Sequence, residues 1–142
     1  MGRTYLFACP KCAYQARVAG GSDEGMNLVI HTCACTDCRR LFDAVQRARL
    51  PLSEARQFGA TAEARTGLAG LRKKRPWRRP PTFEGLLARL GGLSDEPRRW
   101  VEFTPGCAVS RLHRVRPWKI GGRCPRCGAV MERNALPFRL WD

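Results

Sequence analysis

The sequence predicts a small, mostly β protein whose fold is held by metal ions. Three observations lead to this prediction: the chain has 142 residues, it contains eight cysteines, and six of them form three Cys-x-x-Cys pairs. Two residues between cysteines allow both sulfurs to bind one ion at the tip of a tight turn. The first residues lack the apolar stretch of a secretory signal. We therefore expect an unexported, cytoplasmic protein with thiolates on metal rather than disulfides.

The charge distribution divides the chain into three segments. It carries 26 Lys and Arg against 12 Asp and Glu, a formal net charge of +14, of which +1 lies in residues 1–45, +7 in 46–105 and +6 in 106–142. Hydrophobic residues make up 44% of the chain, which excludes a wholly disordered protein, and no apolar run is long enough to cross a membrane. We expect a soluble protein without a membrane partner, with domain boundaries that give residues 1–45, 46–99 and 100–142.

The first segment is predicted to be an antiparallel sheet built around two cysteine turns. A glycine-rich loop at residues 20–25 has turn chemistry and no apolar periodicity. The alternating and β-branched stretches around it favour strands, which we expect at residues 4–8, 14–18, 27–32 and 41–45.

The middle segment, residues 46–99, is predicted to be a basic, partly helical linker. Residues 52–71 contain three glycines, each of which costs a helix about 1 kcal/mol relative to Ala, so we expect a frayed helix or disorder there. Six positive charges within residues 72–79 exclude a core element. Thr82 then fits the N-cap of a short helix over residues 83–90, whose apolar residues recur at the helical period.

The last segment, residues 100–142, is predicted to be a second small, metal-bound lobe. We expect strands at residues 100–104 and 112–118, followed by the turn that carries the last cysteine pair. The tail, residues 136–141, is apolar, so we expect it to pack against the rest of the lobe.

The N-terminal cysteines predict one tetrahedral zinc site. Cys9 and Cys12 are separated from Cys35 and Cys38 by 22 residues, and an aromatic residue follows each pair. The gap is slightly longer than usual, and the glycine-rich loop can take up the excess. This pattern resembles the zinc ribbon, in which two metal-binding turns on hairpins hold one ion. The resemblance covers about residues 4–45 and implies zinc bound by these four cysteines.

Two further donors lie close to this predicted site. His31 and Cys33 would share a strand face with Cys35. A ligand set that includes Cys33, or a second ion shared with His31, is the alternative. We prefer the four-cysteine set because only Cys35 and Cys38 have the spacing of the first pair, which leaves Cys33 as a small, buried apolar residue.

The C-terminal cysteines predict a second zinc site that lacks one cysteine. Cys107, Cys124 and Cys127 supply three thiolates, and Ser110 stands where the ribbon pattern would place the fourth. His113 is the nearest suitable donor, and structural zinc accepts three cysteines with one histidine. The alternatives are that His113 is an exposed base among arginines and that water or nothing fills the fourth position, which would be a feature of catalytic zinc.

The two ends of the chain together resemble small basic bacterial proteins that carry a zinc ribbon at each end. Such proteins close with the pattern Leu-Pro-x-Arg-x-Trp-Asp, which here is residues 136–142. The resemblance implies two ribbon lobes and two zinc ions, and no particular reaction. Each lobe has about 40 residues, near the size at which a hydrophobic core alone seldom suffices. A structural zinc site supplies about 10–16 kcal/mol, so we expect metal removal to unfold both lobes.

The basic residues predict binding to nucleic acid, either DNA or RNA. A surface that neutralises phosphates gives affinity without sequence preference, and an exposed tryptophan can stack on an unpaired base. The expected contacts lie in the linker and the last segment and are Arg72, Lys73, Lys74, Arg75, Trp77, Arg78, Arg79, Arg111, Arg114, Arg116 and Lys119.

The alternative function is that of a protein adaptor within a larger assembly, including a ribonucleoprotein. The ribbons, the apolar tail or the helix over residues 83–90 would then dock on a protein partner. Catalysis and a small-molecule substrate are not expected, because the sequence has no His-Glu-x-x-His motif, phosphate-binding glycine loop or Ser-His-Asp set. Cys-Pro-Lys-Cys is similar to a thiol–disulfide motif, but each pair has a matching pair, which favours metal.

Overall fold

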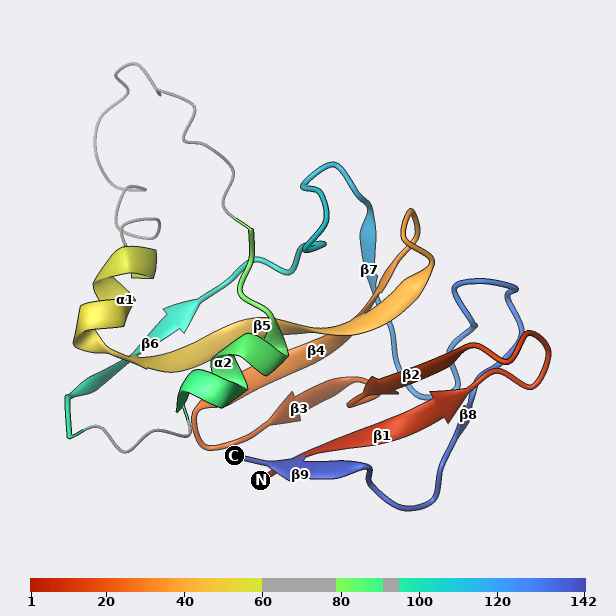
Figure 1. Cartoon of the computed structure of the whole chain (residues 1–142), viewed down its shortest axis with the longest axis horizontal. Coiled ribbons are helices and arrows are strands. Elements are labelled where there is room, and N and C mark those ends of the chain that lie inside the picture. The colour runs from red at the N-terminus through yellow and green to blue at the C-terminus, as the bar shows by residue number, and fades with distance from the viewer. Residues whose placement is uncertain (60–78, 91–94) are drawn as a thin grey trace.

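The computed structural model describes residues 1–59, 79–90 and 95–142. Nine strands and two helices are formed by these residues (Figure 1). In chain order they are β1 Gly2–Ala8, β2 Gln15–Val18, β3 Ser22–Glu24, β4 Leu28–Cys35, β5 Arg40–Pro51, α1 Leu52–Gly59, α2 Phe83–Leu90, β6 Arg98–Glu102, β7 Val115–Pro117, β8 Glu132–Arg133 and β9 Arg139–Trp141. The mostly β character expected from the sequence is confirmed.

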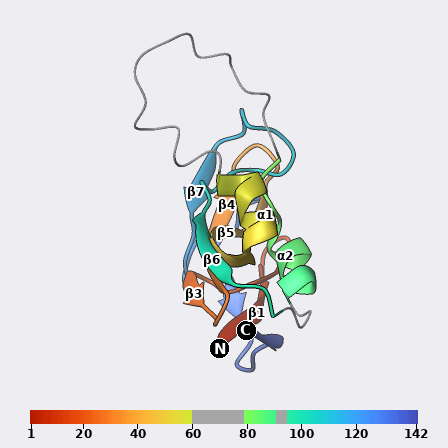
Figure 2. The same cartoon turned by 90° about the vertical axis from the view of Figure 1, so that its left-hand side faces the viewer.

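A five-stranded antiparallel sheet is built around β4. Its order is β3-β4-β5-β6, and β7 pairs with the C-terminal part of β4. Leu28 and Ile30 of β4 are fully buried, because they belong to the face of the sheet that packs against the helices. Both helices lie on the same side of this sheet (Figure 2), where α1 and α2 contribute Ala55 and Leu86 to the core.

A second, four-stranded sheet brings the two ends of the chain together. The first strand, β1, pairs with β2 along one edge and with β8 and β9 along the other. The amino group of Met1 lies 3.0 Å from Oδ1 of Asp142. Trp141 of β9 is buried and meets Phe83 of α2 edge to face, with ring centroids 5.0 Å apart. The expected packing of the tail is therefore confirmed for Trp141.

A buried hydrogen-bond network joins the two sheets. The carboxylate of Asp43 on β5 accepts hydrogen bonds from the backbone N–H of Ala19, at 3.1 and 3.0 Å, and from the hydroxyl of Thr32 on β4, at 2.6 Å. The Thr32 hydroxyl oxygen accepts in turn from the backbone N–H groups of Gly20 and Gly21. These bonds fix the loop that leads from β2 to β3.

The helix predicted over residues 83–90 is confirmed as α2. The Thr82 hydroxyl accepts a hydrogen bond from the backbone N–H of Gly85 at 3.2 Å, which is the expected N-cap contact. In the region expected as a frayed helix or disorder, Leu52–Gly59 forms α1. The remainder of that region and the basic run at residues 72–78 lie outside the described residues.

Several strands differ from the sequence-based expectation. The glycine-rich loop contains β3, and the strand expected at residues 41–45 extends to Pro51. The strand expected at residues 112–118 is only Val115–Pro117. It is shorter because the chain turns before it, where the backbone N–H of His113 donates to the carbonyl of Ser110.

The two end segments are interleaved and do not fold as separate ribbons. The first 45 residues supply β1, which pairs with β8 and β9, and β4, which pairs with β7. Each of these partner strands comes from the last third of the chain. The expected pair of lobes, one from each end, is therefore not the arrangement of the described residues.

Candidate metal centres

The structure gathers the eight predicted metal ligands into two clusters of four. The all-cysteine cluster consists of Cys9, Cys12, Cys124 and Cys127, and the histidine cluster consists of Cys35, Cys38, Cys107 and His113. Within each cluster the sulfur and nitrogen atoms all lie within 4.8 Å of one another. All eight cysteines of the chain are free thiols. The described part of the chain holds these two groups and no third one.

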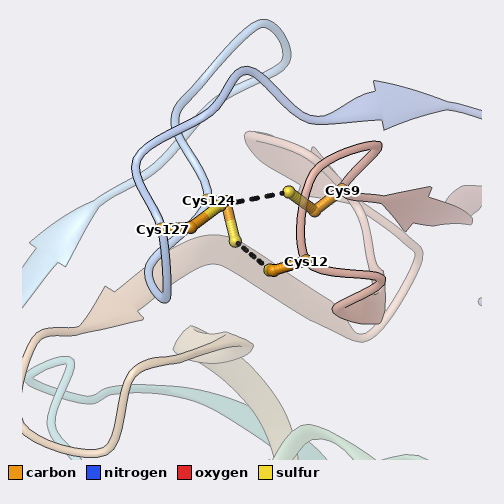
Figure 3. Close-up of side chains that lie close together, drawn as sticks. All are labelled: Cys9, Cys12, Cys124 and Cys127. Atoms are coloured by element: carbon orange, nitrogen blue, oxygen red, sulfur yellow. Dashed lines mark hydrogen bonds between the residues drawn. The ribbon is translucent and has the colours of Figure 1, made fainter.

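The all-cysteine cluster brings together two turns (Figure 3), which share the same pattern of backbone hydrogen bonds. In each turn the N–H of the first cysteine donates to the carbonyl five residues later, Cys9 to Tyr14 and Cys124 to Ala129. In each, its carbonyl accepts from the N–H four residues later, on Ala13 and Gly128.

The sulfur positions of the all-cysteine cluster fit a tetrahedral ion. The Sγ atoms of Cys9 and Cys127 are 3.4 Å apart, and those of Cys12 and Cys124 are 3.7 Å apart. With Zn–S bonds of about 2.3 Å, a tetrahedral site would separate its sulfurs by about 3.8 Å. A disulfide would require about 2.05 Å. The observed distances are therefore those of ligands around a common centre.

The thiols of the all-cysteine cluster differ in their pKa values. Hydrogen bonds from the backbone N–H groups of Cys12 and Lys11 help to lower the pKa of Cys9 to about 6, against the effect of burial. A backbone hydrogen bond from Tyr14 lowers the pKa of Cys12, but burial and the neighbouring thiols outweigh it and raise that pKa to about 12. Four thiolates at this distance repel one another unless a cation lies between them, and a divalent ion supplies that charge.

The histidine cluster has the distances expected of three sulfurs and one imidazole. The Nδ1 atom of His113 lies 3.2 Å from Sγ of Cys38, 3.5 Å from Sγ of Cys107 and 3.8 Å from Sγ of Cys35. The Sγ atoms of Cys38 and Cys107 are 3.6 Å apart. Zn–S and Zn–N bonds in a tetrahedron would give about 3.6 Å between sulfur and nitrogen. His113 thus occupies the place that a fourth cysteine would take.

Backbone N–H groups support the thiolate form in the histidine cluster. The N–H of Cys38 donates to Sγ of Cys35 at 3.3 Å, and the N–H of Val109 donates to Sγ of Cys107 at 3.4 Å. Burial raises the pKa of Cys107, but hydrogen bonds from Val109, Ser110 and His113 outweigh it and lower the pKa to about 6. Burial raises the pKa of Cys38 to about 11.

The predicted pairing of the ligand turns is wrong. Cys9 and Cys12 were expected to share an ion with Cys35 and Cys38, and Cys107 and His113 with Cys124 and Cys127; the structure exchanges the partners. The sheets explain the exchange. The first turn directly follows β1, which pairs with β8 just after the Cys124 turn, whereas the Cys35 turn follows β4, which pairs with β7 just after His113.

One sequence signal for the correct pairing was present. Cys-Pro-Lys-Cys and Cys-Pro-Arg-Cys are nearly identical, and they are the two turns that meet in the all-cysteine cluster. His31 and Cys33 belong to neither cluster. Cys33 is buried, and burial raises the pKa of its thiol to about 11. The structure therefore does not place these two residues among the ligands.

The predicted nucleic-acid contacts fall into two groups. Arg72, Lys73, Lys74, Arg75, Trp77 and Arg78 lie outside the described residues. Arg79 is described and exposed, and so are Arg111, Arg114, Arg116 and Lys119, which surround the ligand His113 or follow it.

The fold and the two clusters define a mostly β protein with two potential metal sites, each made of four Cys or His ligands. No protein-family model matches the chain, and neither a curated protein nor a solved structure does. Among the described residues, neither helix has the length and apolarity needed to cross a membrane.

Proposed function

We propose that the protein is a non-catalytic, zinc-bound protein that binds nucleic acid through its basic surface. Zinc is the metal that best suits tetrahedral sets of thiolates with or without one imidazole. In this proposal the protein is similar to zinc ribbons in its individual ligand turns and differs from them in how the turns are combined. Because each cluster is filled by four protein ligands, no coordination position is left for a substrate, which favours a structural role for the metal.

The basic segment beside the histidine cluster, Arg111, Arg114, Arg116 and Lys119, carries the proposal. Its four cations are exposed, and they lie on both sides of the ligand His113. The backbone N–H of Arg114 donates to the carboxylate of Asp37 at 2.8 Å, and Arg116 is held in β7 opposite Ala34 of β4. Cations on a fixed backbone lose less conformational freedom when they contact phosphates. These positions support a phosphate-binding surface that depends on the metal cluster.

The chain stays strongly basic when both clusters are loaded. Seven ligand thiolates and two divalent ions together lower the formal charge of +14 by three, to +11. Most of this charge lies outside the first 45 residues. A net charge of this size favours association with polyanions through counterion release.

Replacement of the basic segment by glutamine tests this function. We expect the variant with Arg111, Arg114, Arg116 and Lys119 changed to Gln to bind mixed RNA and DNA more weakly at low salt. The dependence of log K on log salt should become shallower, by about 0.9 for each lost contact to a duplex phosphate. Fluorescence anisotropy over a salt series measures both quantities.

A matched variant removes the same charge elsewhere, with Arg3, Arg17, Arg56 and Arg89 changed to Gln. It should keep most of the affinity. Equal weakening by both variants would contradict the assignment of the segment, and absence of binding by the parent protein would contradict the function.

A second candidate function, that of a protein adaptor, is favoured by the C-terminal tail. Leu136, Phe138 and Leu140 are 79%, 50% and 53% exposed. Among the described strands, β9 pairs only with β1, so its other edge is open. An open edge beside exposed apolar side chains suits the addition of a strand from a partner.

Serine substitutions in the tail test the adaptor function. Changing Leu136, Phe138 and Leu140 to Ser should abolish capture of a protein partner in a pull-down that survives nuclease treatment. The buried Trp141 is left intact so that the fold is kept. Unchanged capture by the variant would exclude the tail as the docking surface.

A further inference from the structure

The face of the five-stranded sheet opposite the helices carries cations beside a tryptophan. In the pairing of β5 with β6, Arg49 lies directly opposite Trp100, and Arg47 lies directly opposite Glu102. Residues that are directly opposite in an antiparallel pair point to the same side of a sheet. The four residues therefore share one side, which we call the β5–β6 outer face.

The helices do not cover this outer face. Ala48, Leu50 and Val101 alternate with the outer-face residues along β5 and β6, and they are buried in the core that includes Ala55 of α1 and Leu86 of α2. Both helices lie on that side of the sheet (Figure 2). In the described part of the chain, the outer face of this strand pair is consequently open to solvent, and all four of its residues are exposed.

Trp100 is the exposed tryptophan of the described chain. Its side chain is 39% exposed, whereas Trp118 and Trp141 are 6% and 5% exposed and belong to the cores. The guanidinium of Arg47 lies over the Trp100 ring, 5.3 Å from its centroid. This contact holds the ring in place and sets a positive charge beside it. An exposed indole ring beside a cation can stack on a flat ring while the cation contacts an anion next to that ring.

We propose that the β5–β6 outer face binds unpaired nucleotides, with Trp100 stacking on a base and Arg47 and Arg49 contacting the adjoining phosphates. The inference rests on the proposed nucleic-acid function and names single-stranded nucleic acid as the ligand of this face. The need for a free base face selects the single strand, and the nature of the contacts makes the binding independent of sequence. A base in a duplex has no free face to offer to the ring, and base–aromatic stacking tolerates any base, as does a contact to phosphate.

At Glu102, a substitution is expected to change the affinity of the outer face in the opposite direction from substitutions of the arginines. Its carboxylate stands directly opposite Arg47 on the same face, where it opposes the approach of a phosphate. Removal of this negative charge should strengthen binding, whereas removal of either arginine should weaken it. Effects of opposite sign from neighbouring positions are hard to produce by general loss of structure.

The decisive experiment compares two ligands and two tryptophan variants. Anisotropy is measured with a labelled oligothymidylate and with a labelled duplex of equal length, for the full-length, metal-loaded protein. We expect Trp100→Ala to lower the affinity for the single strand about ten-fold, with little change for the duplex. Trp100→Phe, which keeps a ring, should retain most of the affinity. Arg47→Gln with Arg49→Gln should weaken single-strand binding, and Glu102→Gln should strengthen it.

The outcomes separate this inference from the function on which it rests. If the parent binds both ligands and Trp100→Ala leaves single-strand binding unchanged, the outer face is not the site, although the nucleic-acid function stands. If the parent binds neither ligand, both fail. Metal content and circular dichroism of each variant identify loss of structure. If Trp100→Ala loses metal, the test of the proposal rests on the arginine and Glu102 variants. If all of these bind the single strand with the same affinity as the parent, the proposal is overturned.

Discussion

Asp43 is an acidic residue whose protonation is altered by the fold. Burial raises the pKa of its carboxyl group to about 6, and the charges of Asp23 and Glu84 act in the same direction. The hydrogen bonds from Thr32 and Ala19 lower the pKa but do not offset burial. An unperturbed aspartate has a pKa of about 3.9, so the folded state holds this proton more tightly than the unfolded state does.

This shift predicts a specific pH dependence of stability. The contribution of Asp43 is fully present below about pH 4 and is lost as the pH rises through about 6, because the folded chain must then hold a buried carboxylate. Asp43→Asn has no such titration. We expect the free energy of unfolding of the parent, relative to Asp43→Asn, to fall by about 1.4 kcal/mol for each pH unit between about pH 4 and about pH 6, on the order of 3 kcal/mol in all.

Denaturant unfolding of the two proteins at matched pH values measures this difference. The comparison uses the pH values at which metal analysis shows that both proteins keep their metal, because metal release itself unfolds the chain. A difference that does not change with pH would show that Asp43 titrates in its ordinary range.

Spacing identified the ligand residues, but it could not identify residues such as Asp43. Paired cysteines carry a signal because two residues between them allow both sulfurs of one tight turn to bind the same ion. His113 could be reached by elimination, as the nearest donor to an incomplete set. Asp43 is a single polar residue in a strand, and its role depends on Ala19 and Thr32, which only the assembled sheets bring to it.

At the scale of elements, three ligand turns share one backbone conformation. The residue four positions after the first cysteine has a positive φ in each: 57° at Ala13, 51° at Arg39 and 78° at Gly128. This left-handed conformation costs a residue with a side chain about 1–2 kcal/mol, whereas glycine adopts it freely. Two of the three turns therefore hold a residue that the backbone disfavours.

A reciprocal pair of substitutions tests this strain. Ala13→Gly should raise the free energy of unfolding by up to about 1 kcal/mol, and Gly128→Ala should lower it by about 1 kcal/mol. Apart from Gly128 itself and its two chain neighbours, no residue would have an atom within 4 Å of a Cβ placed there, so the expected loss comes from the backbone alone. Thermal or denaturant unfolding of the metal-loaded proteins provides the measurement. Effects of the same sign for both substitutions would contradict the explanation.

Elements with a local signal were predictable, and those defined by partners were not. The helix α2 has a capping threonine and a helical repeat of apolar residues within eight positions. In contrast, β3 is three polar residues that form a strand only because β4 lies beside them. The bounds of β7 are likewise set by β4 and by the turn that carries His113.

At the scale of the whole molecule, each metal cluster ties the beginning of the chain to its end. Cys12 and Cys124 are 112 residues apart in sequence, and Cys38 and Cys107 are 69 residues apart. Cross-links over such distances remove much entropy from the unfolded chain, since the loops they close are long. Chelation of the metal should therefore unfold the described sheets together.

Double substitutions distinguish this arrangement from two separate ribbons. Cys9→Ser with Cys124→Ser disables one cluster and should leave one metal ion per chain. Cys9→Ser with Cys35→Ser disables both and should leave none. The pairing predicted from the sequence gives the opposite results. Native mass spectrometry counts the ions, and the absorption of Co²⁺-substituted protein distinguishes the all-cysteine cluster from the histidine cluster.

The sequence does not show which ligand turns share an ion, because the spacing of cysteines constrains only ligands on the same turn. Cys9 and Cys12 must share an ion, but nothing local says whether its other ligands belong to the Cys35 turn or to the Cys124 turn. The choice is made by strand pairing between β1 and β8 and between β4 and β7, which is a property of the assembled sheets.

Because the ligands of each cluster are far apart in sequence, they become available at different times during synthesis of the chain. As the chain leaves the ribosome, Cys9 and Cys12 emerge first, and they must wait until Cys124 and Cys127 have been made. Until then four N-terminal thiols from two half-sites are present together without their final partners. These half-sites could combine with each other in the transient pairing that the sequence suggests. Maturation would then require the nascent chain to exchange ligands, so a metal ion that binds early would delay folding, whereas one that binds late would complete it.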